Sequence, residues 1–163
     1  MSARAFAPWV KPIAAQLREG RRQVIDFARS APKQIWDRPS PLEGWTYKDV
    51  LAHLAGGNDQ MLQKILRSVV AREQIDASIL GLDTDAENAR GVRERRPRPV
   101  QELIDELEAD GEETQDLLSR LGEDDQELRQ DSAPISLGQF LGLVHAENHD
   151  MLHLQELRAA LSS

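Results

Sequence analysis

The chain has 163 residues, a length that fits one domain able to bury a core without disulfides or structural metals. It contains no cysteine, which excludes disulfides, cysteine-based zinc sites and protein thiolate nucleophiles. Its 28 acidic and 20 basic side chains give a net charge of −8, a field that repels nucleic acid unless the basic residues gather on one face.

These limits predict a single cytoplasmic domain over residues 1–163, without nucleic-acid or membrane partners. The first ten residues lack the apolar run of a signal peptide, and no segment approaches the ~20 apolar residues that span a bilayer. The lack of cysteine agrees with a reducing compartment. One basic cluster is interpreted as a solvated face and linker, because acidic sequence flanks it and no aromatic residues interleave it. The alternative is that one of its arginines receives a substrate carboxylate. The cluster consists of Arg90, Arg93, Arg95, Arg96 and Arg98.

Helical periodicity dominates, and no run of five or more residues alternates as a strand does. The first helix is predicted over residues 8–30, with one apolar stripe and with Arg21 and Arg22 facing water. A proline-rich connection follows over residues 31–44.

The second predicted helix, over residues 46–69, has the clearest start signal in the chain. Thr46 is placed as the N-cap, and Asp49 stands three residues later, the spacing of a capping box.

His53 lies in the second turn of that helix, and Gly56 and Gly57 follow it closely. Two glycines inside a helix cost roughly 1–2 kcal/mol, so they require a reason. One reason is close packing against another helix, and the other is room for a ligand beside His53.

The polar segment over residues 71–97 is predicted to wrap one end of the molecule and to contain a short helix over residues 84–96. Pro99 suits the first turn of a third long helix, whose apolar residues recur through Leu121.

One helical turn is predicted over residues 124–130. Ser136 and Gln139 have capping-box spacing and open a fourth helix to about residue 161. Four amphipathic helices indicate an all-α protein, an antiparallel four-helix bundle.

The four histidines are the strongest candidates for a functional site. Three of them, His145, His149 and His153, stand four residues apart, so on one helix they share a drifting stripe. Neighbours are about 6 Å apart along the axis and can share an ion, whereas the outer pair is about 12 Å apart and cannot. The spacing therefore predicts a metal site made of His53 and one HxxxH pair, and leaves open whether that pair is 145/149 or 149/153.

Three segments resemble the DinB superfamily, particularly the branch with mycothiol-dependent maleylpyruvate isomerases. Residues 44–62 read GWTYKDVLAHLAGGNDQML and are similar to the second-helix signature, and residues 36–46 (WDRPSPLEGWT) resemble the same branch. Residues 147–157 (ENHDMLHLQEL) resemble the last-helix motif, in which a histidine or glutamate precedes a histidine by four residues. The resemblance implies a four-helix bundle with a zinc or nickel ion between helices 2 and 4, held by His53, His149 and His153.

His145 is not one of the ligands that the resemblance implies. The resemblance leaves it as a group next to the ligands or at the entrance of the site, such as a proton carrier, or as a surface histidine. Asn58 and Asn148 are neighbours of the ligands that could orient substrate or water, or they are ordinary polar residues of a helix.

Three protein ligands would leave a divalent ion an open position, as in catalytic sites. Because the chain has no cysteine, any thiol must come from a small molecule. The resemblance implies a thiol-dependent transferase or isomerase acting on small electrophiles in detoxification, with mycothiol, bacillithiol or glutathione as cosubstrate, and a homodimer. The alternatives are a metal-dependent hydrolase in toxin resistance and a non-catalytic stress or ligand-binding bundle.

Overall fold

The computed structural model describes residues 5–56, 58–80 and 84–162, without the side chains of residues 58–60 and 80. Its α-helices are α1 (Lys11–Ser30), α2 (Tyr47–Gly56), α3 (Asn58–Ala71), α4 (Ala77–Leu80), α5 (Thr84–Arg95), α6 (Val100–Ser119), α7 (Leu137–Glu147) and α8 (His149–Ala159). Its two 3-10 turns are η1 (Lys33–Ile35) and η2 (Asp124–Glu127). Within the described ranges there is no β-strand, only an isolated bridge between Pro39 and Thr46, so the all-α prediction is confirmed.

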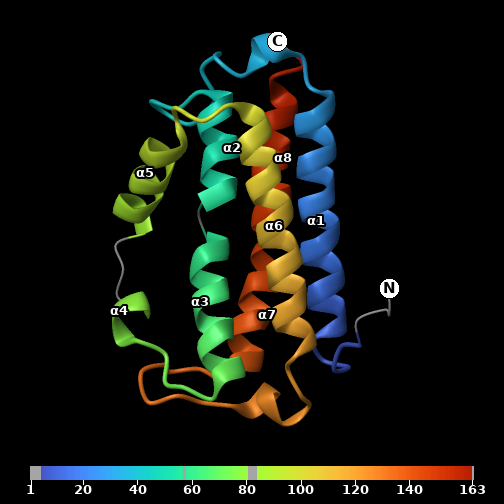
Figure 1. Ribbon diagram of the computed structural model, residues 1–163, viewed down its shortest axis with the longest axis vertical. Helices are drawn as coiled ribbons and strands as arrows, with labels where there is room; N and C mark the ends of the chain where they lie inside the picture. Colours follow the sequence, from blue (N-terminus) through green and yellow to red (C-terminus); the bar gives the residue numbers. More distant parts are fainter. Residues whose placement is uncertain (1–4, 57, 81–83, 163) are drawn as a thin grey trace.

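The long helices lie side by side as a bundle (Figure 1). Helix α6 packs against α1, α2 and α3, and α8 packs against α1 and α2. In Figure 1 the chain ascends through α1 and through α7 and α8, and descends through α2 and α3 and again through α6. Helices α3 and α6 therefore run in the same direction, which differs from the antiparallel order predicted from the sequence. The reason is α5, which runs back along the bundle before α6 begins.

Both long-helix starts predicted from capping residues are confirmed. The Thr46 N–H donates to Asp49 Oδ2 at 3.0 Å, and the Asp49 N–H donates to Thr46 Oγ1 at 3.2 Å. Ser136 and Gln139 make the same reciprocal pair, at 3.0 and 3.3 Å. Each box satisfies two N–H groups that a helix start leaves without partners.

The predicted fourth helix is two helices, because Asn148 interrupts it in the left-handed conformation (φ 48°, ψ 53°). Asparagine adopts this conformation more readily than most residues. Gly20 of α1 lies against the junction: a Cβ there would be 3.2 Å from Asp150 Cβ and 3.7 Å from Asn148 Oδ1. As a result His145 belongs to α7, whereas His149 and His153 belong to α8.

Gly56 permits close packing between α2 and α5. A Cβ at position 56 would lie 2.2 Å from Cζ of Arg95, and a Cβ at Gly91 would lie 3.3 Å from the Gly56 carbonyl oxygen. The packing explanation of Gly56 is therefore confirmed, while Gly57 lies outside the described residues. Figure 1 shows α5 alongside α2. The polar segment that contains α5 is predicted from the sequence to wrap one end of the molecule, and for α5 this prediction is wrong.

The interpretation of the basic cluster as a solvated face is wrong in part. Arg95 is only 5% exposed and donates to Glu106 at 2.6 Å. Arg96 forms an ion pair with the buried Asp49 at 3.0 Å. These two arginines thus connect the end of α5 to α6 and α2.

The core consists of two apolar clusters at different heights in the bundle. One is centred on Leu51, Leu103 and Leu154, and the other on Leu66, Leu118 and Leu141. Buried polar side chains lie at or near the sequence positions where one cluster gives way to the other. They include Arg21, Gln63, Thr114 and Asp150, and we call this set the polar layer.

Gln63 shows how the layer satisfies its polar atoms: it donates to the Asp110 carbonyl oxygen at 3.0 Å and to Thr114 Oγ1 at 3.3 Å. No helix in the described part of the chain is long and apolar enough to cross a membrane.

Candidate metal centre

Three imidazoles meet where α2 faces α8. The ring centroid of His53 lies 5.0 Å from that of His149 and 4.8 Å from that of His153, and the last two are 4.6 Å apart. One ring nitrogen of each residue lies within 4.8 Å of the corresponding nitrogens of the other two. The structure thus brings together the three histidines that the family resemblance names.

The spacing of the nitrogens is compatible with a shared ion. Nε2 of His53 is 3.1 Å from Nε2 of His149. A tetrahedral zinc with ligands at about 2.0–2.1 Å places its ligand nitrogens roughly 3.3 Å apart. Imidazole ligands suit zinc, nickel, copper and iron, so the donor set fits a divalent transition metal.

Burial keeps two of these imidazoles neutral. His53 is 4% exposed, and desolvation, assisted by His149 and His153, lowers its pKa to about 3. Desolvation and the neighbouring His153 lower the pKa of His149 to about 4, against an opposing effect of Asp150. Both rings therefore carry a free lone pair at pH 7, which is the form that binds a metal.

Glu156 orients the third imidazole, and it is not among the site residues predicted from the sequence. Its Oε2 lies 2.6 Å from Nδ1 of His153. An ionised carboxylate only accepts, so Nδ1–H donates, and in the neutral ring this tautomer leaves the lone pair on Nε2. The spacing in the sequence could have predicted this contact, because a residue three positions after His153 lies on the same helix face.

His53 is held differently. Its Nδ1 is buried and makes no hydrogen bond to the described residues. The Trp45 ring lies against it, with centroids 5.3 Å apart and planes tilted by 51°. Packing by Trp45 thus restrains the His53 ring, whose Nδ1 has no hydrogen bond to fix its orientation.

Removing the charge of Glu156 is expected to weaken metal binding about tenfold, since partners that orient a histidine ligand contribute 10- to 100-fold to affinity. The test is the Glu156→Gln variant in competition with a chromophoric chelator. Glu147→Gln is the matched control. Glu147 lies two residues before His149 and its side chain is exposed, so this variant removes the same charge without removing a contact to His153. An equal loss in both variants would show that net charge, and not the contact with His153, is responsible.

The other residues singled out from the sequence have different positions. His145 lies half-buried in the last turn of α7 and is not part of the histidine cluster. Asn148 forms the junction between α7 and α8, with its side-chain oxygen close to Gly20 of α1. Asn58 begins α3, and its side chain lies outside the described residues.

Arg21 is buried, so the prediction that it faces water on the first helix is wrong. It is 7% exposed, and its Nε and Nη2 donate to the two carboxylate oxygens of Asp150 at 2.8 and 3.3 Å. Its Nη1 donates to the Leu107 carbonyl oxygen at 3.2 Å. The periodicity of one helix could not identify this burial, because Asp150 is 129 residues away in the sequence. The ion pair anchors α8 to α1 at the residue next to His149.

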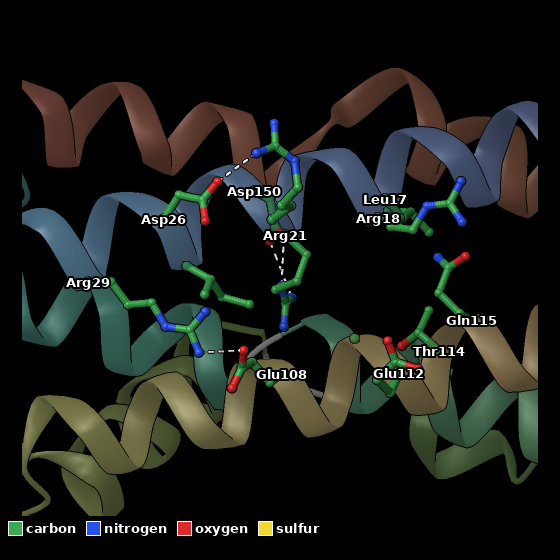
Figure 2. Close-up of a pocket in the computed structure, with 13 residues that line it drawn as sticks. Leu17, Arg18, Arg21, Asp26, Arg29, Glu108, Glu112, Thr114, Gln115 and Asp150 are labelled. Atoms are coloured by element: carbon green, nitrogen blue, oxygen red, sulfur yellow. Dashed lines mark hydrogen bonds and ion pairs between the residues drawn. The ribbon is translucent and has the colours of Figure 1, made fainter. Parts of the chain in front are cut away.

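A groove of about 450 Å³ lies between α1 and α6, and Figure 2 shows the residues that line it. Arg29 and Glu108 pair across it at 2.6 Å, and the Arg21–Asp150 pair lies inside it. Its described lining includes none of the three clustered histidines. The groove therefore borders the polar layer without reaching the imidazoles.

No curated protein and no solved structure matches the chain. The family described as the mycothiol maleylpyruvate isomerase N-terminal domain matches residues 17–152, which include His53 and His149. The match extends over most of the helical bundle and ends one residue before His153. The chain belongs to the mycothiol maleylpyruvate isomerase N-terminal domain family.

Proposed function

We propose that the chain binds a divalent metal, zinc or nickel, between α2 and α8 through His53, His149 and His153. The observation that carries this proposal is the mutual approach of the three imidazoles. The low pKa values of His53 and His149 support it, as does the contact between Glu156 and His153.

We further propose that this centre serves a thiol-dependent transferase or isomerase acting on small electrophiles. A divalent ion with three protein ligands would supply a Lewis-acidic centre with an open coordination position. The chain itself has no thiol, so the sulfur nucleophile would belong to a low-molecular-weight thiol. The family description, which names mycothiol, supports this choice.

The protein's own residues would have three tasks in such a reaction. His53 and His149 would present neutral imidazoles as ligands, because burial lowers their pKa, and Glu156 would keep His153 in one tautomer. The Arg21–Asp150 pair would fix the start of α8, and with it the position of His149. In a transfer, the thiol would lose its proton and form a carbon–sulfur bond as the leaving group departs. In an isomerisation, addition and elimination of the same thiol would regenerate it.

Thiol-dependent turnover of a chromogenic aryl halide tests the proposal. The zinc- or nickel-loaded chain is expected to form a thioether and release halide with mycothiol, bacillithiol or glutathione, and the His53→Ala variant is expected to lose this activity. The measurement is the rate of thioether formation against thiol concentration.

Two results would contradict a thiol-dependent activity. Consumption of electrophiles without thiol, giving a product that contains water oxygen, would indicate a hydrolase. A fully metal-loaded chain that turns over no electrophile with any of the three thiols would indicate a binding protein.

A further inference from the structure

A small apolar cavity of about 140 Å³ adjoins His149, and we call it the His149 cavity. It lies where α1, α3 and α7 meet the start of α8. Its apolar lining consists of Leu17, Met61, Leu62, Phe140, Leu143 and Val144. A dry apolar cavity of about 150 Å³ holds a benzene-sized molecule, so this space fits a group of about six carbons.

The charges around the His149 cavity disfavour anions. The ionisable residues of its described lining are Glu147, His149 and Asp150, and none of the described lining residues is an arginine or lysine. The Asp150 carboxylate is already paired with Arg21, which lines the groove on the other side. Away from His149, a dicarboxylate in the cavity would therefore meet apolar side chains and the Glu147 carboxylate, and no cationic side chain among the described lining residues.

A second apolar cavity, of about 390 Å³, continues the path toward the far end of α3. Ile65 and Val69 of α3 line it together with the segment over residues 128–137, and we call it the loop cavity. Phe140 is half-buried and is the one described residue that lines both cavities. An extended apolar molecule beside His149 would thus meet Phe140 first and the loop cavity beyond it.

We propose that the substrate of this site is uncharged and apolar, with its reactive end beside His149 and its apolar part directed toward Phe140. The assignment of this molecule as a substrate rests on the proposed function. The cavity's preference for uncharged apolar molecules over dicarboxylates rests on its lining alone. This substrate class differs from the carboxylate-bearing maleylpyruvate in the family's description.

The test uses straight-chain primary alcohols of four to ten carbons as neutral probes and succinate as the dianionic probe. Methionine methyl resonances report the site, because the chain has three methionines and Met61 lines the cavity, whereas Met151 packs against the other apolar cluster. Alcohols are expected to shift the Met61 signal, with Kd falling about fourfold per added methylene until about six carbons. Tighter binding of succinate than of hexanol at Met61, or no shift of Met61 with any alcohol, would overturn the proposal.

Two variants locate the binding site, and exposed leucines provide a matched pair. Leu143 lines the cavity and is 62% exposed, so Leu143→Arg is expected to fold and to weaken hexanol binding roughly five- to tenfold. Leu152 is 51% exposed on α8 and does not line the cavity, so Leu152→Arg is expected to bind hexanol as the wild type does. Equal weakening in both variants would overturn the assignment of the cavity.

Phe140→Ala is expected to join the two cavities, so that the gain in affinity continues beyond six carbons to eight and ten. An unchanged length limit in this variant would overturn the role of Phe140 as the divider.

Metal content, measured in the same samples, distinguishes the two proposals: alcohol binding at Met61 without a stoichiometric metal would leave the cavity assignment intact and contradict the proposed function.

Discussion

The His53→Ala variant is expected to lose stoichiometric metal, with affinity reduced more than about 100-fold. The reason is that His53 is the one ligand supplied by α2, and the two histidines of α8 cannot complete a three-ligand site without it. Even the outer partners of such ligands contribute 10- to 100-fold, so a ligand itself contributes more. The measurement is elemental analysis after dialysis, followed by competition with a chelator.

His153→Ala is expected to behave as His53→Ala does, whereas His145→Ala is expected to retain the metal. His145 makes a suitable control, because it is a histidine one turn before His149 in the sequence but lies on α7 outside the cluster. Circular dichroism of each variant separates loss of metal from loss of the fold. If His145→Ala removed the ion and His153→Ala did not, the ligand assignment would be wrong by one helical turn.

The Arg21→Met variant is expected to lower the free energy of unfolding by about 3–5 kcal/mol, the cost of leaving one member of a buried ion pair unpaired. Asp150 is 9% exposed, and removal of the guanidinium would leave its carboxylate in an environment that disfavours charge. Urea denaturation of the metal-free chain measures the effect without a contribution from metal binding.

Arg22→Met is the matched control for Arg21→Met. Arg22 forms ion pairs with Glu19 and Asp26, but its side chain is 58% exposed, so its removal is expected to cost much less stability than removal of Arg21. The double variant Arg21→Met/Asp150→Leu is expected to recover most of the lost stability, because no unpaired charge remains. Equal losses in Arg21→Met and Arg22→Met would contradict the importance of the buried pair.

The helix starts were predictable because capping is local. Each capping box satisfies its own N–H groups within a single turn. The two boxes are formed by Thr46 with Asp49 and by Ser136 with Gln139. Each of these interactions depends on residues three positions apart, so the sequence contains all the information that the interaction needs.

The interruption at Asn148 was not predictable in the same way. A left-handed asparagine costs little, and whether the chain adopts it depends on what packs against it. Here Gly20, on a helix distant in the sequence, allows α1 to approach the junction closely. This interruption separates His145 from the other two histidines, whereas periodicity alone placed all three on one stripe.

The sequence by itself determined the helical class, the capped helix starts and the spacing of His149 and His153, because each of these depends on interactions within one or two turns. Only the tertiary structure decided which histidines meet, since His53 and His149 are 96 residues apart and come together through the packing of α2 against α8. It also decided that Arg21 is buried. A charged side chain enters the interior only where a distant partner satisfies it, and no helical pattern encodes that partner.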